Sequence, residues 1–374
     1  RALTESSGKD IAGFMDPWLE KSGFPVVTVT QEGSNVNFSQ HHFLLDSNKA
    51  KRDRTWPIPL LSSNKNIPDL LDKRKLVVNI GKSAFVQINK DAVGHYIVNY
   101  ETPEHKNKLA ELAHSKKLSA PERLMLLSDN SLLARSGILS QKNTLELLKS
   151  YTNEDNESVW DIISLVLSDT RRFIDMDLGL EKHIKLFTRT IIEQQYKRLG
   201  WRPISNESSK DTKLRALILG SGVYSEHPKI THKAHELFED FRKDNTSVIP
   251  ELRGLVIASA IRGKLPKAFD YLLSLEESTS DVSLKPELMG SLCLTDSPKQ
   301  ISMLLERIKD PNKVRAHDVD HWLAYLLRSR HAGKLAWDWM RDNWSWLEKT
   351  FGSDKSYDYL PRYAASAFNT RELM

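Results

Sequence analysis

The sequence of 374 residues contains little that would mark a disulfide-bonded or membrane-spanning protein. It has one cysteine, Cys293, which excludes an internal disulfide and favours a reducing compartment. Cys293 stands in an apolar, helix-like run, so we expect a buried and unreactive thiol. No run of about 18 consecutive apolar residues occurs, so no membrane span is predicted. The first residues show no signal-peptide pattern, and the expectation is a cytoplasmic location.

Clustered charge of one sign is also lacking. The net charge is +5 and the pI is near 9.0, but acidic and basic residues are interspersed along the chain. The densest basic run, Lys49–Arg54, is interrupted by Asp53 and is typical of an exposed loop. A nucleic-acid-binding surface needs basic residues gathered in one patch. The sequence therefore predicts no nucleic-acid partner.

The stretch Leu76–Pro103 carries the strongest pattern of alternating apolar and polar residues. The runs Leu76–Ile80, Phe85–Gly94 and His95–Tyr100 are rich in β-branched and aromatic residues, and the turn-forming residues Asn89, Asp91 and Gly94 lie between the two halves of the stretch. This pattern predicts a β-hairpin. Further strands are predicted upstream, at Phe24–Thr30, Val36–His41, Phe43–Leu45 and, as an edge strand, Trp56–Leu60. Strand number and turn density indicate a small antiparallel β-sandwich over residues 24–103.

After Pro103 the apolar period changes from two to about 3.6 and stays there to the C-terminus. Ser119, Pro121 and Glu122 form a helix-start signal, and Gly137 is a stop signal for the same helix. Helix pairs recur at roughly 30 to 45 residues, the spacing of HEAT- or armadillo-like α–α superhelices. Residues 104–374 are thus predicted to form a helical solenoid. The fold class is multidomain α+β, and residues 1–23 form an additional helical segment.

Five stretches, taken together and in order, resemble the M1 family of zinc aminopeptidases. In one of them, Gly94–Tyr100 is similar to the "G-Y-Y-R-V-n-Y" strand of that family, with Ile97 where the family usually has Arg. The five stretches are Phe14–Trp18 with Ser22–Val29, Trp56–Leu60, Val86–Tyr100, Ser119–Gly137, and Leu335–Trp344. They cover nearly the whole chain. The resemblance places the chain in the C-terminal half of such an enzyme, with residues 1–23 as the closing helix of the catalytic domain.

The resemblance also implies what this chain does not carry. The family holds zinc with His-Glu-x-x-His and a downstream Glu, and it binds the substrate N-terminus with Gly-x-Met-Glu-Asn; neither motif occurs in this sequence. The expected role is a helical bowl that caps the active site and shapes the peptide cavity. Its partners would be the enzyme's own N-terminal and catalytic domains and the peptide substrate, with zinc in the parent enzyme and no cofactor in this chain. The alternative is a standalone helical-repeat scaffold that binds a protein or peptide.

Arg315 and Asp318 are the candidate site residues. Val314–Asp318 resembles the family's "v-R-x-Q-D" stretch, which suggests a substrate-side or interdomain contact for Arg315 and Asp318; capping of a helix by Asp318 or Asp320 is the alternative. His317 and His321 have the i, i+4 spacing of a zinc motif. The Asp between them is one methylene too short to act as the base, and no Glu follows at the required distance. We therefore predict no metal site here.

Four other groups are interpreted as structural. Neighbouring strand residues His41 and His42 would point to opposite faces. The cluster of His232, His235, Glu236 and Glu239 is flanked by charge, as on a solvated helix face. The tryptophans Trp337, Trp339, Trp344 and Trp346, and the run Gly220–Gly222, indicate helix packing rather than an aromatic platform or a phosphate loop.

Overall fold

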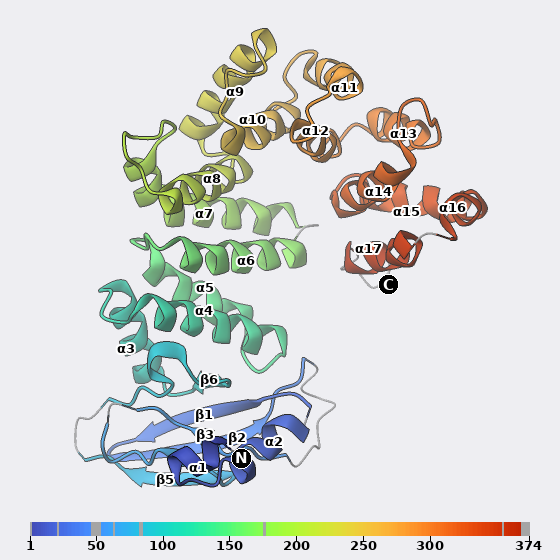
Figure 1. Cartoon of the computed structure of the whole chain (residues 1–374). Coiled ribbons are helices and arrows are strands. Elements are labelled where there is room, and N and C mark those ends of the chain that lie inside the picture. Colours follow the sequence, from blue (N-terminus) through green and yellow to red (C-terminus); the bar gives the residue numbers. More distant parts are fainter. Residues whose placement is uncertain are drawn as a thin grey trace. The chain divides into compact units, whose positions relative to one another are not determined.

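The computed structural model divides into two compact units. Unit 1 is Arg1–Ser168 with Glu193–Lys197, and unit 2 is Asp169–Ile192 with Arg198–Met374 (Figure 1). The structure describes residues 2–20, 22–45, 54–62, 64–81, 85–174, 177–353 and 355–367. The predicted loop Lys49–Arg54 lies, except for Arg54, outside the described residues. Predicted domain boundaries at residues 23 and 103 stay predictions.

Short strands come first and helices follow, as the change of period predicts. The elements of the N-terminal part are α1 (Ala2–Ser7), α2 (Ile11–Glu20), β1 (Pro25–Glu32), β2 (Asn35–His42), β3 (Ile58–Pro59), β4 (Leu70–Leu71), β5 (Lys75–Asn79), the 3₁₀ turn η2 (Lys90–Ala92) and β6 (Ile97–Tyr100). The helices are α3 (Pro103–His114), α4 (Ala120–Arg135), α5 (Gln141–Leu148), η3 (Lys149–Tyr151), α6 (Glu157–Ile174), α7 (Leu178–Leu199), α8 (Ser209–Tyr224), α9 (Pro228–Lys243), α10 (Pro250–Arg262), α11 (Ala268–Ser278), α12 (Leu284–Leu292), α13 (Pro298–Arg307), η4 (Ala316–Asp318), α14 (Val319–Arg328), α15 (Gly333–Asp342), α16 (Trp344–Phe351), η5 (Lys355–Asp358) and α17 (Tyr359–Ala367). A β-region followed by a helical region is thus confirmed.

The main sheet has the strand order β5-β2-β1-β6. The pairs β1–β2 and β2–β5 are antiparallel, whereas β1 and β6 are parallel, with Val26 opposite Ile97. The sheet is therefore mixed, which differs from the all-antiparallel prediction. A second sheet joins β3 and β4.

The predicted hairpin within Leu76–Pro103 is wrong. Strands β5 and β6 pair with β2 and β1, not with each other. Between them, the backbone amide of Asn89 donates to the carbonyl of Leu60 instead of to a strand partner. The predicted turn residues do form a turn. The Asn89 side chain accepts from the backbone amide of Gly94 at 2.6 Å and donates to the Gly94 carbonyl at 3.0 Å. A local turn therefore forms, but the strand after it pairs with a distant part of the chain.

The β-region of unit 1 is packed against α4. Val26, Phe43, Ile97 and Leu133 form one buried cluster, which joins β1 and β6 to the helix. Ile97, at the position where the resembling family has Arg, is 2% exposed. An apolar residue therefore fits this position better than a charge, because an unpaired buried charge is costly.

The start and end of α4 agree with the sequence. Ser119 and Glu122 form a reciprocal capping box, with the Ser119 amide donating to the Glu122 carboxylate at 2.7 Å. Gly137 follows the helix with a φ of 78°, which favours glycine. These short-range signals fix the helix boundaries without help from distant residues.

In unit 2, successive helices pack mainly on their sequence neighbours, as expected for helical repeats. Helix α10 contacts α8, α9 and α12, and α14 contacts α15 and α17. Gly222 on α8 faces Ile230 on α9, and a Cβ added there would lie 2.3 Å from Ile230 Cδ1. Close helix packing is therefore confirmed for Gly222.

Candidate functional site

Arg315 and Asp318 lie in the connection between α13 and α14. Arg315 is exposed and precedes the turn η4, and no hydrogen bond or ion pair joins its side chain to any residue that the structure describes. Asp318 is half-buried and occupies the N-cap position of α14 without a side-chain capping bond. Capping by Asp318 is therefore wrong. The backbone amide of Asp318 donates to the carbonyl of Arg315 at 2.9 Å, but no hydrogen bond or ion pair joins their side chains in the part of the chain described.

The histidines of the same segment are not arranged as a metal site. His317 belongs to η4 and His321 to α14, and their side chains are 72% and 62% exposed. Each lies 3.7 Å from the carboxylate of a neighbouring aspartate, Asp318 or Asp320. Among the described residues, no group of three or more His, Cys, Asp or Glu is placed to hold a metal ion.

The other residue clusters named from the sequence contribute to helix packing or form side-chain pairs at the surface. His232 pairs with Glu236 at 3.2 Å on an exposed helix face. Trp339 is buried, packs edge-on against Trp346 and donates from its indole nitrogen to Glu306. Within the described residues, none of the helices is both long and apolar enough to cross a membrane.

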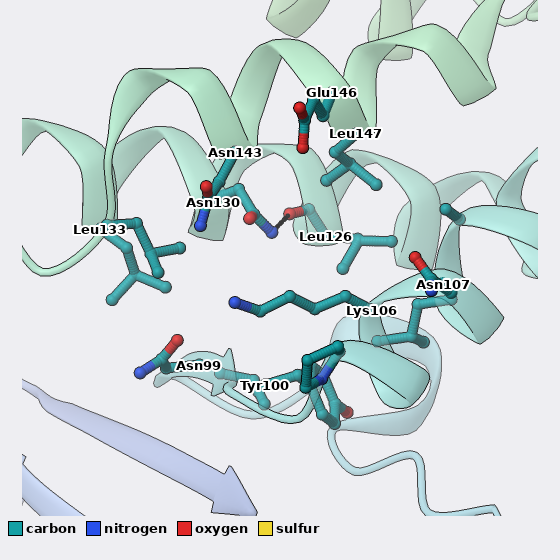
Figure 2. Close-up of a pocket in the computed structure, with 15 residues that line it drawn as sticks. Asn99, Tyr100, Lys106, Asn107, Leu126, Asn130, Leu133, Asn143, Glu146 and Leu147 are labelled. Atoms are coloured by element: carbon teal, nitrogen blue, oxygen red, sulfur yellow. Dashed lines mark hydrogen bonds between the residues drawn. The ribbon is translucent and has the colours of Figure 1, made fainter.

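Unit 1 contains a pocket that the sequence did not predict, between β6, α3, α4 and α5 (Figure 2). Its volume is about 380 Å³. We call it the Lys106 pocket, because the side chain of Lys106 extends into it (Figure 2). Five leucines supply much of its apolar lining: Leu109, Leu126, Leu133, Leu139 and Leu147. Amide side chains and one carboxylate supply the polar lining: Asn99, Asn107, Asn130, Asn143 and Glu146.

Two polar groups of the Lys106 pocket have unused hydrogen-bonding capacity. Asn99 is 1% exposed; its amide nitrogen donates to Glu101 at 3.2 Å and to Thr28 at 3.4 Å. Its carbonyl oxygen Oδ1 is buried and has no partner in the described structure. Lys106 is half-buried, and its amine makes no hydrogen bond or ion pair with any described residue. Buried polar groups are nearly always paired, so an unpaired acceptor beside a free amine needs an explanation.

A second pocket of unit 1, of about 630 Å³, is lined by residues of β6, the preceding turn and α4. Asp129 of α4 contributes a carboxyl group that is 6% exposed and accepts from the backbone amide of Val98 at 2.9 Å. Burial raises the pKa of Asp129 to about 8, although the bond from Val98 opposes this. At neutral pH most molecules therefore hold Asp129 as a neutral acid. It lies among apolar side chains such as Phe24, Met125 and Leu132.

The sequence contains a signal for Asn99 but none for Lys106. Asn99 interrupts the otherwise apolar strand Ile97–Tyr100, in which all four residues are buried. A polar residue at such a position needs a partner, which marks it as a candidate. Lys106 is one of several charged residues in α3, and only the packing of α4 and α5 over it distinguishes it from the others.

Comparison with known proteins gives consistent matches. The family model described as "ERAP1-like C-terminal domain" matches residues 85–374. Aminopeptidase N of Lactococcus lactis subsp. cremoris (strain MG1363) is 31% identical over 383 residues, which cover 99% of this chain and 44% of the relative. Glutamyl aminopeptidase of Mus musculus is 28% identical over 385 residues, covering 99% of this chain and 40% of the relative. The chain thus spans less than half the length of these curated relatives.

Proposed function

Since the chain belongs to the ERAP1-like C-terminal domain family and corresponds to the C-terminal part of an M1-family aminopeptidase, we propose that it is the non-catalytic part of a zinc enzyme that removes N-terminal residues from peptides. In that enzyme it caps the active site and shapes the cavity that holds the peptide. The match over residues 85–374, on a sequence without His-Glu-x-x-His, is the observation that supports this most directly.

The proposal assigns the bond-breaking chemistry to residues outside this chain. Bound zinc would supply a Lewis acid and an activated water for amide hydrolysis. Since none of the described residues form a group fit for a metal ion, the ligands would come from the catalytic domain. The contribution of this chain is to exclude water from the closed site and to position long peptides, as lid domains do.

Arg315 is our candidate for a direct contact with the substrate or the catalytic domain. Its guanidinium is exposed and free of partners in the described structure, so it can form a bidentate pair with a carboxylate. An exposed arginine that serves only as surface charge would contribute less than about 1 kcal/mol. Removing Arg315 should therefore lower kcat/KM if the residue contacts the substrate or the catalytic domain, and should leave kcat/KM unchanged if it is only a surface charge.

The test uses the full-length enzyme that contains this chain. The chain alone should not cleave an amino-acid anilide, whereas the full-length enzyme should cleave it. Deleting this region should lower kcat/KM more for a long peptide than for the anilide, since only the long peptide would use the cavity. Equal rates with and without the region, at equal stability of the catalytic domain, would contradict the capping role.

A matched pair of variants tests Arg315. Arg315→Ala should lower kcat/KM on the long peptide by about tenfold or more, the effect of one charge-assisted contact. Arg202→Ala removes another exposed arginine, in the connection between α7 and α8, and should leave the kinetics unchanged. If Arg315→Ala matches Arg202→Ala in both kinetics and melting temperature, Arg315 has no contact role.

A further inference from the structure

The Lys106 pocket combines three features that one kind of ligand would satisfy together. It has a free amine, a buried acceptor without a donor, and a wall of leucines. All of its lining residues belong to unit 1, so the pocket is complete within one compact unit. The inference from these features does not depend on the proposed function.

The charged and polar groups define the ligand's head. Lys106 presents an ammonium group, which calls for an anion such as a carboxylate. The Asn99 carbonyl oxygen has two lone pairs and no donor, so an N–H group of a ligand could donate to it. Figure 2 shows the Lys106 amine and the Asn99 amide at the same end of the pocket. A carboxylate and an ammonium on the same carbon atom, as in an α-amino acid, would thus meet both.

The leucines and the volume define the ligand's body. Leu126 and Leu133 of α4 face the pocket together with Leu139 and Leu147, so an unbranched polar side chain would leave apolar surface uncovered. A volume of about 380 Å³ lies near the lower end of the range for ligand pockets, roughly 300–1,000 Å³. This suits one small molecule and leaves little room for an extended peptide.

We propose that the Lys106 pocket binds a free α-amino acid with an apolar side chain, held by its carboxylate at Lys106 and its ammonium at Asn99 Oδ1. Bound in this way, the ligand gives the buried carbonyl of Asn99 the donor that the protein does not supply. The side chain replaces pocket water against the leucines, which is favourable because apolar area leaves water.

Direct titration of the full 374-residue chain tests the ligand class. L-Leucine should bind with a dissociation constant of about 1 mM or tighter, a value within reach of so small a ligand. L-Leucinamide lacks the carboxylate and 4-methylpentanoate lacks the ammonium, so each should bind at least tenfold more weakly. L-Glutamate, which would place a charge against the leucines, should also bind at least tenfold more weakly. No binding of L-leucine, or equal binding of L-leucine and L-leucinamide, would overturn the proposal.

Three variants locate the site. Lys106→Met keeps the length of the side chain but removes the charge, and it should weaken L-leucine binding by roughly tenfold or more. Lys108→Met is the matched control, because Lys108 lies two residues further along α3 and pairs with Glu111 at the surface. Ala110→Phe places a ring in the pocket itself and should block binding while Lys106 and Asn99 remain. If L-leucine binds equally well to correctly folded Lys106→Met and Ala110→Phe, it binds elsewhere and the proposal is wrong.

Discussion

Arg330 donates from Nη1 to the carboxylate of Glu181 at 2.5 Å, although the two residues are 149 positions apart. Both belong to unit 2, and their side chains are 24% and 17% exposed. Lys185 contacts the same carboxylate at 3.1 Å and also pairs with Glu226. One acidic side chain of α7 is thus shared by two cations, one from its own helix and one from the segment between α14 and α15. Most helix contacts in this unit are local, so this pair is an exception.

Removing Arg330 should destabilise unit 2 modestly. Arg330→Met leaves Lys185 as the partner of Glu181, so we expect a loss of about 1 kcal/mol, or roughly 2–4 °C in melting temperature. Arg341→Met is the control, because Arg341 pairs with Asp338 on an exposed surface and should change stability by less than about 0.5 kcal/mol. Equal effects of the two substitutions would show that the long-range pair adds nothing beyond a surface contact.

The same pair should weaken in acid. Burial by itself would raise the pKa of Glu181, but the hydrogen bonds from Arg330 and Lys185 outweigh it and hold the pKa below the ordinary value of 4.5. For a lowered carboxyl pKa, the stabilisation is present above the unfolded value and is lost as the pH falls through the folded value. A double-mutant cycle of Arg330→Met with Glu181→Gln should therefore give a coupling energy at pH 7 that disappears in strong acid.

The pair Arg123–Glu154 in unit 1 should matter more. Arg123 donates to Glu154 through Nε at 2.6 Å and Nη2 at 2.9 Å, and the side chains are 7% and 2% exposed. Arg123→Met leaves a buried carboxylate without its cation, which costs about 3–5 kcal/mol. Lys116→Met is a nearby control, because Lys116 pairs with Asp155 at the surface and should lose less than about 1 kcal/mol. Thermal unfolding of both variants would rank the two pairs, and similar losses would contradict the prediction.

Asp129 should make stability fall as the pH rises. Its pKa is about 8 in the folded chain, against an ordinary value of 3.8. Between these values the folded state binds a proton that the unfolded state has released, so the contribution of Asp129 to stability is largest below pH 4 and declines until about pH 8. The decline is at most about 1.4 kcal/mol per pH unit.

Asp129→Asn provides the matched background for that measurement. The amide can still accept from Val98 but does not titrate. The stability of the original chain, measured relative to this variant by urea unfolding, should decrease from pH 5 to pH 8 and then level off. A difference that is constant or that grows with pH would mean that Asp129 is charged in the folded chain.

Two glycines of α8 provide a test of helix packing with a built-in control. A Cβ at Gly222 would meet Ile230 Cδ1 at 2.3 Å, whereas a Cβ at Gly220 would meet nothing within 4 Å. Gly222→Ala should therefore lose about 1–3 kcal/mol through overpacking. Gly220→Ala should gain up to about 1 kcal/mol, since alanine is the better helix former. Melting temperatures that move in the same direction would contradict the assignment of Gly222 as the packing glycine.

Signals from residues close together in the sequence predicted much of this fold. They did not predict which strands pair when the strands are far apart in the sequence. The capping box of Ser119 and Glu122, and the stop at Gly137, depend on neighbours within a few residues, so the sequence predicts them directly. The hairpin prediction failed because alternation shows that a segment is a strand but does not identify its partner. Strand β6 pairs with β1, about 70 residues earlier in the sequence, which no local pattern indicates.

Local sequence patterns were also insufficient to predict the candidate site. Arg315 and Asp318 are predicted because the motif around them resembles a known one, and the structure joins them at the turn η4 by a backbone hydrogen bond but not through their side chains. The Lys106 pocket takes residues from one strand and three helices. A lysine on a charged helix and an asparagine in a strand become neighbours only when those elements pack, so composition and spacing could not indicate the pocket.

The parallel pairing of β1 with β6 has a consequence for synthesis on the ribosome. Strands β1 and β2 can pair as soon as His42 has emerged, but the other edge of β1 is covered only when Ile97–Tyr100 has been made. During that interval Val26, Val27 and Val29, which are fully buried in the finished sheet, lie on a strand with an open edge. The nascent chain should therefore be most prone to aggregate, and most dependent on chaperones, between the translation of about residue 42 and residue 100.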